Sequence, residues 1–386
     1  MGQINSKIPH KMVSLFAGIG GFELGFRTIG TETTLMCEID NVAKHVLESN
    51  IPNVPIVEDV CLLKNLPLKT DLLCAGFPCQ DLSSVGEKHG LDGTRSSLVK
   101  EVFRLLSKRK VEWVIFENVS FMLSLKGGEA IRNIVDNLEN LGYNWAYRLI
   151  DSISFVPQHR NRVYVVASLH HDPCDIILSG ESTINYGQIN KTDFEKPLGF
   201  YWTEGKSALG LVSDAIPTLK AGSTIGIPSP PAIAYPSGRV AMPDIRDAER
   251  LQGFPPNWTL PAEDVAKPSY RWRLVGNAVT VDTIAWIASK FITPVKYDSS
   301  NDTILDEKKW PHAAWGKNGK RFSSNASSLP ATARQSGLEE YLKFPMKDLS
   351  LRASKGFYSR LLEGNLKRPE YFNQAIVEHI KIKENE

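Results

Sequence analysis

The sequence predicts an α/β protein in which a mostly parallel sheet carries helices on both faces. Short apolar runs alternate with amphipathic stretches over residues 12–168, and this rhythm is typical of successive βαβ units. The first apolar run ends in a glycine-rich turn at 16–21. Two later runs end at Cys79 and at Glu117. Because sites in such sheets lie beyond the strand ends, these positions indicate where the chemistry takes place.

The individual elements follow from the apolar pattern and its periodicity. The predicted strands of the sheet are 12–17, 33–39, 71–75, 113–117, 144–149 and 162–167. The predicted helices between and after them are 21–29, 41–49, 96–107 and 128–141.

Beyond the predicted sheet the composition and the hydrophobic periodicity change, and the chain divides into four segments. Residues 1–169 form the first domain, and 170–244 are rich in Gly, Ser and Pro, which predicts a loop-rich module with short strands. Helices at 245–252 and 279–292 return to core-like sequence, so 245–293 is assigned to the first domain again. Residues 294–386 form a C-terminal extension with helices at 351–362 and 369–380.

Composition narrows the class of protein. The chain has 386 residues, 42% of them hydrophobic and 23% charged, with a net charge of +2. No apolar run reaches 18 residues and the N-terminus lacks the apolar core of a secretory signal, so we expect neither a membrane span nor secretion. Five cysteines without a C-x-x-C pair argue against zinc or a disulfide framework and for the cytoplasm: Cys37, Cys61, Cys74, Cys79 and Cys174.

The glycine-rich turn predicts a nucleotide site without a pyrophosphate. Gly18 and Gly20 fit the dinucleotide fingerprint, but its third glycine position is occupied by Glu23. Glu38 follows the second strand, where an acid suits a ribose diol. Asp59 either accepts from an adenine amino group or simply shapes a turn. An adenosine ligand that lacks pyrophosphate points to S-adenosylmethionine.

Three features suggest covalent catalysis at Cys79. A lone cysteine at a strand end is more often structural. Here Pro78 fixes the backbone before it, and Glu117 ends a neighbouring strand. Arg160 and Arg162 stand two residues apart, so both can lie on one strand face and hold a base carbonyl or a phosphate.

The ordered set of motifs resembles the DNA (cytosine-5)-methyltransferases over 12–168 and 245–292. Each motif alone is weak, whereas their shared order is specific. The motifs are Phe16-Ala17-Gly18-Ile19-Gly20-Gly21, Gly76-Phe77-Pro78-Cys79-Gln80, Arg95-Ser96-Ser97-Leu98, Glu117-Asn118-Val119, Gln158/Arg160/Arg162, Arg250-Leu251-Gln252-Gly253-Phe254-Pro255 and Gly276-Asn277-Ala278-Val279.

The resemblance implies a Rossmann-like methyltransferase fold, and it implies the role of each site residue. Cys79 would attack C6 of cytosine, Glu117 would meet N3, Arg162 would hold O2, and Arg160 would support it. S-adenosylmethionine would leave as S-adenosylhomocysteine, with no metal involved. Its pocket would comprise Phe16, Gly18, Gly20, Glu38, Ile39, Asp59, Leu98, Asn277 and Val279. For Asn277 and Val279, a helix cap and a core residue are the alternatives.

The resemblance also implies double-stranded DNA as the partner. The target base would flip out of the duplex, because C5 lies within the stack. A loop over 80–95 would close on DNA through Ser83, Ser84, Gly86 and Arg95. Residues 170–244 would be the target-recognition domain, with Thr218 and Leu219 as its signature and Asp214 as a further candidate. We expect a monomer that functions beside a restriction endonuclease in a bacterium or phage.

The sequence gives less support to three other functions. A tRNA cytosine methyltransferase of the same superfamily usually shows Cys-Phe-Thr, which the chain lacks. A catalytically idle DNA-binding regulator would not need the Cys79, Glu117 and Arg162 set, and a nicotinamide dehydrogenase would need the third glycine. Residues 294–386 carry 16 Lys/Arg against 12 Asp/Glu, so this extension either contacts DNA or packs as an appendage.

Overall fold

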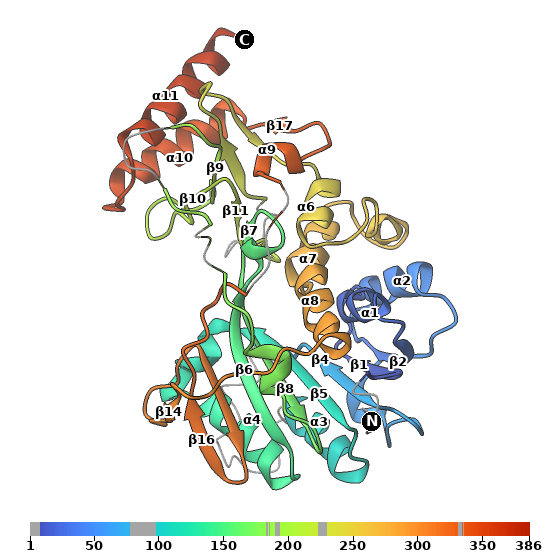
Figure 1. The fold of residues 1–386 in the computed structure, drawn as a ribbon. Helices are drawn as coiled ribbons and strands as arrows, with labels where there is room; N and C mark the ends of the chain where they lie inside the picture. Colours follow the sequence, from blue (N-terminus) through green and yellow to red (C-terminus); the bar gives the residue numbers. More distant parts are fainter. Residues whose placement is uncertain are drawn as a thin grey trace, which may run out of the picture. The chain divides into compact units, whose positions relative to one another are not determined.

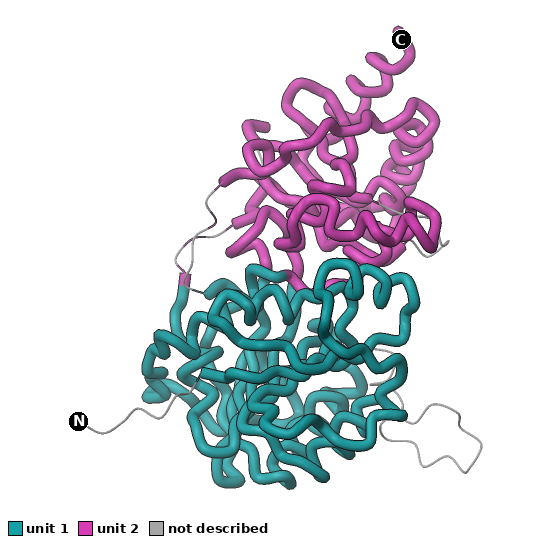
Figure 2. Tube along the Cα trace, turned by 90° about the vertical axis from the view of Figure 1, so that its right-hand side faces the viewer, with its two compact units in different colours: residues 1–151, 161–181, 281–331 teal, residues 152–160, 182–280, 332–386 magenta. Residues whose placement is uncertain are grey.

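The chain folds into two compact units in a computed structural model. The model describes residues 8–77, 98–182, 184, 186–189, 194–222, 230–330, 334 and 336–386. Unit 1 comprises residues 1–151, 161–181 and 281–331, and unit 2 comprises residues 152–160, 182–280 and 332–386 (Figure 2). The predicted site residues Cys79, Ser83, Ser84, Gly86 and Arg95 lie outside the described residues.

Unit 1 is built on a ten-stranded sheet with the order β14-β16-β15-β6-β8-β5-β4-β1-β2-β3 (Figure 1). The strands between β3 and β5 pair in parallel, and those from β5 to β14 pair in antiparallel fashion. The strands are β1 (Lys11–Leu15), β2 (Glu32–Cys37), β3 (Ile56–Val57), β4 (Leu72–Ala75), β5 (Trp113–Val119), β6 (Asn144–Asp151), β8 (Asn161–Ser168), β14 (Thr303–Ile304), β15 (Ala313–Lys317) and β16 (Lys320–Ser323).

Helices cover both faces of this sheet, so its central strands are apolar on both sides. On one face α3 and α4 pack on Val114 and Phe116 of β5. On the other face α1 and α8 pack together, and Phe291 of α8 meets Trp113 with ring centroids 4.8 Å apart. The helices of unit 1 are α1 (Gly21–Arg27), α2 (Asn41–Asn50), α3 (Leu98–Lys108), α4 (Glu129–Asn140), α5 (Cys174–Ile177) and α8 (Val281–Ile292).

The close approach of α1 to α8 depends on Gly25. A Cβ atom at Gly25 would lie 2.4 Å from Cγ2 of Ile284, well inside van der Waals contact. The glycine therefore lets α8, which comes from the far end of the chain, lie directly against the first helix.

Unit 2 contains a five-stranded sheet with the order β10-β9-β12-β13-β17 and a two-stranded parallel pair, β11-β7. Its strands are β7 (Gln158–His159), β9 (Leu198–Phe200), β10 (Val212–Ser213), β11 (Ile216–Pro217), β12 (Ala232–Ala234), β13 (Val240–Met242) and β17 (Lys347–Asp348). Its helices are α6 (Ile245–Leu251), α7 (Tyr270–Asn277), α9 (Leu338–Tyr341), α10 (Leu351–Glu363) and α11 (Glu370–Asn385).

The predicted α/β class is confirmed, while the two compact units divide the chain differently from the four predicted segments. Residues 245–280 fall in unit 2, 294–331 in unit 1, and 332–386 again in unit 2. The extension is also not wholly helical, because β14, β15 and β16 add to the main sheet. The turn between β15 and β16 is Asn318-Gly319, and both residues have positive φ. This dipeptide is a strong hairpin signal.

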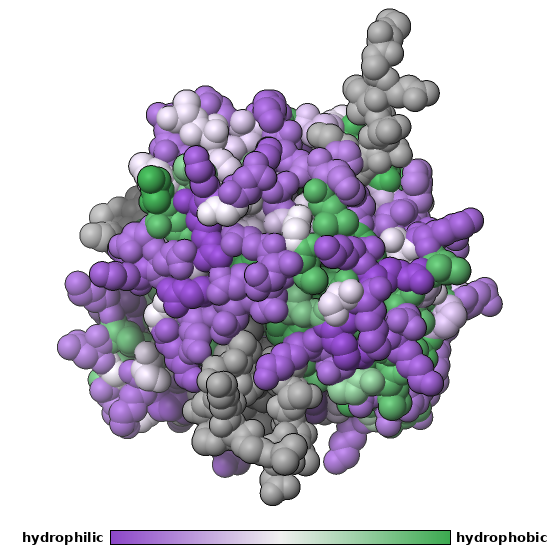
Figure 3. All heavy atoms as spheres, turned by 90° about the horizontal axis from the view of Figure 1, so that it is seen from below, coloured by the Kyte–Doolittle hydropathy of each residue, from purple (hydrophilic) through white to green (hydrophobic). Residues whose placement is uncertain are grey.

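Among the described residues, no helix is both long and apolar enough to cross a membrane. The face drawn in Figure 3 carries mostly hydrophilic residues, with smaller apolar patches between them.

Candidate functional site

The glycine-rich turn and Glu38 meet at the carboxyl ends of β1 and β2. The turn requires left-handed backbone at Phe16, Gly18 and Gly20, with φ of 57°, 58° and 93°. Oε2 of Glu38 accepts a hydrogen bond from the Gly18 N–H at 2.7 Å, and Oε1 accepts from the Asp40 N–H at 2.8 Å. The carboxylate therefore holds the turn in place while keeping lone pairs free for further donors.

Glu38 is nearly buried, at 9% exposed. Burial raises the pKa of this carboxyl above its usual value, and the two backbone N–H donors oppose the rise. Beside it, the side chain of Ile39 is 70% exposed. An exposed large apolar side chain next to a carboxylate suits a ligand with a flat apolar part and a hydroxyl-bearing part.

Asp59 follows β3, the next parallel strand. The Glu38 N–H donates to the Val57 carbonyl at 3.0 Å, so the two strand ends lie side by side. Oδ1 of Asp59 accepts from the Cys61 N–H at 2.8 Å, which makes Asp59 the cap of a short turn of 3₁₀ helix.

The remaining predicted cofactor residues divide between the units. Phe16 and Leu98, the first residue of α3, both border the core of unit 1. Asn277 and Val279 belong to unit 2, where Asn277 is exposed at the end of α7 and Val279 is 9% exposed.

Glu117 and Arg162 form an ion pair across β5 and β8. Antiparallel pairing sets Val119 opposite Arg162 and Glu117 opposite Tyr164, which places the acid and the arginine on one face. Nε of Arg162 lies 3.0 Å from Oε1 of Glu117, and the side chains are 15% and 11% exposed. The two side chains are therefore in contact, and their catalytic roles stay predictions.

Asn118 links this pair to Phe77, which follows the end of β4. Its Nδ2 donates to the Phe77 carbonyl at 2.9 Å, and its Oδ1 accepts from the Val119 N–H at 2.8 Å. Phe77 is two residues before Cys79. The side chain of Asn118 is 3% exposed, so it holds the ends of β4 and β5 together.

Arg160 is placed differently from Arg162. It lies in unit 2 and is 2% exposed. Its guanidinium donates to the carbonyls of Leu219 at 3.0 Å, Gly276 at 3.2 Å and Ala278 at 2.7 Å. With three carbonyls accepting from it, the Arg160 guanidinium holds these backbone segments of unit 2 together, and its supporting role in catalysis stays a prediction.

Thr218 and Leu219 join the same network. The Thr218 hydroxyl donates to the His159 carbonyl at 2.7 Å, and the Leu219 N–H donates to Oε1 of Gln158 at 2.8 Å. Leu219 is 3% exposed, so its side chain is in the core and is not available to DNA. This corrects the expectation of a direct contact by Leu219.

Gln252 is the residue of this network to which sequence reasoning gave no role. Its Nε2 donates to the Val275 carbonyl at 2.9 Å, and its Oε1 accepts from Nε2 of Gln158 at 3.1 Å and from the Thr280 hydroxyl at 2.9 Å. Both glutamines are fully buried. Gln252 stands in a quoted motif, but its partners are far along the chain, so periodicity gives no signal for them.

Within the part of the chain that the structure describes, no group of three or more His, Cys, Asp or Glu side chains is arranged to hold a metal ion.

Comparison with known proteins agrees with this geometry. Residues 10–217 match the family model of the C-5 cytosine-specific DNA methylases. The chain is 44% identical over 362 residues to the type II methyltransferase M2.BsuMI of Bacillus subtilis strain 168, which covers 91% of this chain and 92% of that protein. It is 27% identical to M.MspI of Moraxella sp over 74% of this chain and 71% of that protein.

Solved structures support the fold. A mutant of DNMT2 from Spodoptera frugiperda aligns with a TM-score of 0.53 and 16% identity, covering 73% of this chain and 99% of that one. The Dnmt2 methyltransferase of S. pombe aligns with a TM-score of 0.53 and 17% identity, covering 75% and 100%. At such identity the likeness concerns the fold, which is that of Rossmann-like methyltransferases.

The family match, the extended identity to a type II methyltransferase and the shared fold agree on one conclusion. The chain belongs to the C-5 cytosine-specific DNA methylases, and it is a DNA (cytosine-5)-methyltransferase whose family uses S-adenosylmethionine as methyl donor.

Proposed function

We propose that this enzyme methylates C5 of a cytosine within a specific sequence of duplex DNA, after flipping the base out of the stack. Unit 1 carries the chemistry and the cofactor, and unit 2 carries target recognition. The observation that carries the proposal is the Glu117–Arg162 ion pair at 3.0 Å. Glu117 is on β5, which pairs with β4, the strand that precedes Cys79 in the sequence. As in type II systems, methylation would protect DNA from a cognate endonuclease, and the enzyme would work as a cytoplasmic monomer.

The reaction begins with the Cys79 thiolate, which forms a bond to C6 of cytosine. The electron pair of the C5–C6 double bond then shifts through the ring toward N3, and C5 becomes nucleophilic. Glu117 supports this shift only as the protonated acid that donates to N3. The entering base therefore replaces Arg162 as the partner of Glu117, which leaves Arg162 free to donate to O2.

The cofactor site fits an adenosine. The lone pairs left on Glu38 suit the ribose hydroxyls, exposed Ile39 suits the adenine face, and the second oxygen of Asp59 suits the adenine amino group. Phe16, Gly18, Gly20 and Leu98 would complete the pocket within unit 1. Asn277 and Val279 of unit 2 are proposed as cofactor contacts from the family resemblance alone. When bound, S-adenosylmethionine supplies an electrophilic methyl group on its sulfonium.

After C5 has gained the methyl group, a base removes the C5 proton. The electron pair of the C5–H bond re-forms the C5–C6 double bond, the C6–sulfur bond breaks, and Cys79 leaves as thiolate. The products are 5-methylcytosine, S-adenosylhomocysteine and one proton. Ser83, Ser84, Gly86 and Arg95, on the loop after Cys79, are proposed to hold the DNA, together with Thr218.

The test is methyl transfer in vitro, with tritiated S-adenosylmethionine offered in parallel to duplex DNA and to tRNA. We expect label in duplex DNA as 5-methylcytosine, and bisulfite sequencing of host DNA after expression gives the target sequence. Cys79→Ser should abolish transfer while duplex binding remains measurable. Label found only in tRNA, or wild-type turnover in Cys79→Ser, would contradict the proposal. Resistance of the methylated DNA to one restriction endonuclease tests the pairing.

A further inference from the structure

We propose that residues 334–386 belong to the DNA-reading part of the enzyme, and that the Asp214–Arg334 ion pair positions the recognition segment 214–220. This inference rests on the proposed role of unit 2 in target recognition. It gives a role to a segment that lies wholly beyond the residues matched by the family model, which end at 217.

Asp214 lies at the turn between β10 and β11, with φ of 53°. Its Oδ2 lies 2.6 Å from Nη2 of Arg334, and its Oδ1 accepts from the Leu338 N–H at 2.8 Å. Nη1 of Arg334 also donates to the Asp214 carbonyl at 2.9 Å, so one arginine holds both the side chain and the backbone of this turn. Lys196 adds a longer contact at 3.5 Å.

These contacts make Asp214 a positioning residue and not a base reader. Its side chain is 16% exposed and that of Arg334 is 5% exposed. A carboxylate with a guanidinium and a backbone N–H on its oxygens has little left for a base edge. Its turn leads directly into β11 and Thr218, and a change in that turn shifts the segment as a whole.

The helix α9 adds apolar contacts to the polar contacts that hold the Asp214 turn. Leu338, its first residue, is fully buried in one apolar cluster with Ile216, Leu219, Leu251 and Val275. The C-terminal segment therefore touches the recognition segment on one side and α6 and α7 on the other, within unit 2.

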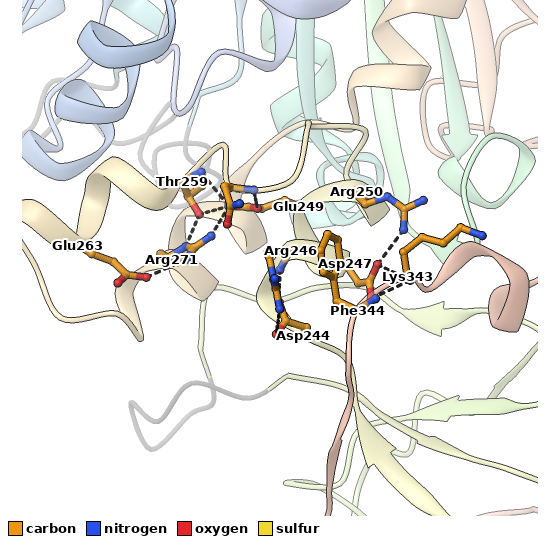
Figure 4. Close-up of polar contacts among 11 residues, drawn as sticks. Asp244, Arg246, Asp247, Glu249, Arg250, Thr259, Glu263, Arg271, Lys343 and Phe344 are labelled. Carbon is orange, nitrogen blue, oxygen red and sulfur yellow. Dashed lines mark hydrogen bonds and ion pairs between the residues drawn. The ribbon is translucent and has the colours of Figure 1, made fainter.

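Asp247 and Arg250 of α6 fix the segment that follows α9 (Figure 4). Buried Asp247 accepts from the backbone N–H groups of Lys343 at 3.0 Å and Phe344 at 2.9 Å, and from Nη1 of Arg250 at 2.8 Å. Arg250 also donates to the Tyr341 carbonyl, and the Tyr341 hydroxyl donates to the Arg250 carbonyl at 2.5 Å.

A second buried network holds the loop that follows α6 (Figure 4). Oε1 of Glu249 accepts from Nη2 of Arg271 at 2.9 Å and from the Thr259 N–H at 2.8 Å. Arg271 reaches on to Glu263 at 2.8 Å. The helix that receives the C-terminal segment is thus itself fixed within unit 2.

The rest of the C-terminal segment completes the five-stranded sheet. β17 pairs with β13 through Asp348 and Ala241. Phe357 of α10 and Phe372 of α11 are fully buried against Phe200, with ring centroids 4.9 and 5.1 Å from it. These two helices form one side of the apolar core of unit 2. We therefore expect that the recognition segment 214–220 is not held in place without them.

The experiment compares Asp214→Asn, Arg334→Gln, the double variant and the control Lys11→Gln, in the full-length enzyme. Lys11 lies in unit 1, its side chain is 39% exposed, and its Nζ lies 4.0 Å from the carboxylate of Glu32. The readout is the ratio of methylation at the target sequence to methylation at sites that differ by one base pair, alongside kcat, KM for DNA and Kd for S-adenosylmethionine.

We expect each single variant to lower this ratio by about tenfold, roughly the worth of one base pair, and to raise KM for DNA. The double variant should be no worse than the poorer single variant, because both residues act through one contact. The kcat at saturating DNA and the cofactor Kd should stay within about twofold, and Lys11→Gln should match wild type.

Loss of discrimination in Asp214→Asn alone, with Arg334→Gln unchanged, would show that Asp214 meets DNA directly and would overturn the inference. Additive losses, or a fall in kcat with unchanged discrimination, would overturn it too. If the neutral variants fold poorly, Arg334→Lys keeps the ion pair and should restore discrimination, and failure to do so in stable protein counts against the inference. A wild-type enzyme that methylates no DNA refutes the proposed function itself.

Discussion

Replacing Glu23 by Gln should remove a pH dependence of stability that the fold builds into unit 1. Glu23 lies on α1 and is 2% exposed. Burial raises the pKa of this carboxyl from 4.5 to about 7. Between these values the folded protein keeps a proton that the unfolded chain has lost, so stability falls as pH rises through this window.

The magnitude follows from the size of the shift. One pKa unit corresponds to about 1.4 kcal/mol. The shift therefore lowers the unfolding free energy of the wild type by about 3 kcal/mol between pH 4.5 and pH 8. Below pH 4.5 both states are protonated and no dependence remains. Gln at position 23 resembles the protonated acid and does not ionise. The stability of the variant relative to the wild type should therefore rise from pH 5 to about pH 7 and level off by pH 8.

Urea unfolding at pH 5, 6, 7 and 8, followed by tryptophan fluorescence, measures this effect. Five of the eight tryptophans, the buried Trp113 and Trp145 among them, lie in unit 1, so most of the signal comes from that unit. The control is Glu32→Gln, at an exposed glutamate whose side chain is 68% accessible. A stability difference between Glu23→Gln and wild type that stays constant across this pH range would refute the reasoning.

Three further predictions follow from single contacts. Glu38→Gln removes the carboxylate charge that the Gly18 N–H faces. It should weaken S-adenosylmethionine binding, measured by calorimetry, by about 10- to 100-fold, in line with about 1.5–3 kcal/mol for a charged hydrogen bond. Unchanged affinity would show that Glu38 does not bind the cofactor. Gly25→Val forces a side chain into Ile284 and should cost about 1–3 kcal/mol of unfolding free energy, whereas an unchanged denaturant midpoint would contradict the packing. Arg160→Gln leaves buried carbonyls without donors and should lower the unfolding free energy of unit 2 by about 1.5–3 kcal/mol. An unfolding free energy equal to that of wild type would contradict its positioning role.

Local pattern predicted the central sheet, because each strand there is a continuous apolar run. The strands at 72–75 and 113–119 are buried along almost their whole length, so their sequence differs sharply from the loops around them. The site residues at strand ends followed from the same logic: Glu38 lies directly after β2 as expected, whereas Glu117 lies inside β5, which continues to Val119.

The parts that sequence did not predict are those built from long-range pairing. β17 is two residues long, and only its partner β13, more than a hundred residues earlier, makes it a strand. Likewise, Asp214 and Arg334 have no local pattern in common. Charged residues at such a distance reveal their pairing only in the fold, which is why the C-terminal segment looked like an appendage.

The most direct test of the account is a covalent trap with a duplex that carries 5-fluorocytosine at the target position. Fluorine cannot leave C5 as a proton does, so the elimination step fails and the enzyme stays joined to the base. With S-adenosylmethionine present, mass spectrometry should find the modified base on the peptide that contains Cys79. Protein that binds both ligands yet forms no adduct, or an adduct at another residue, would contradict the account.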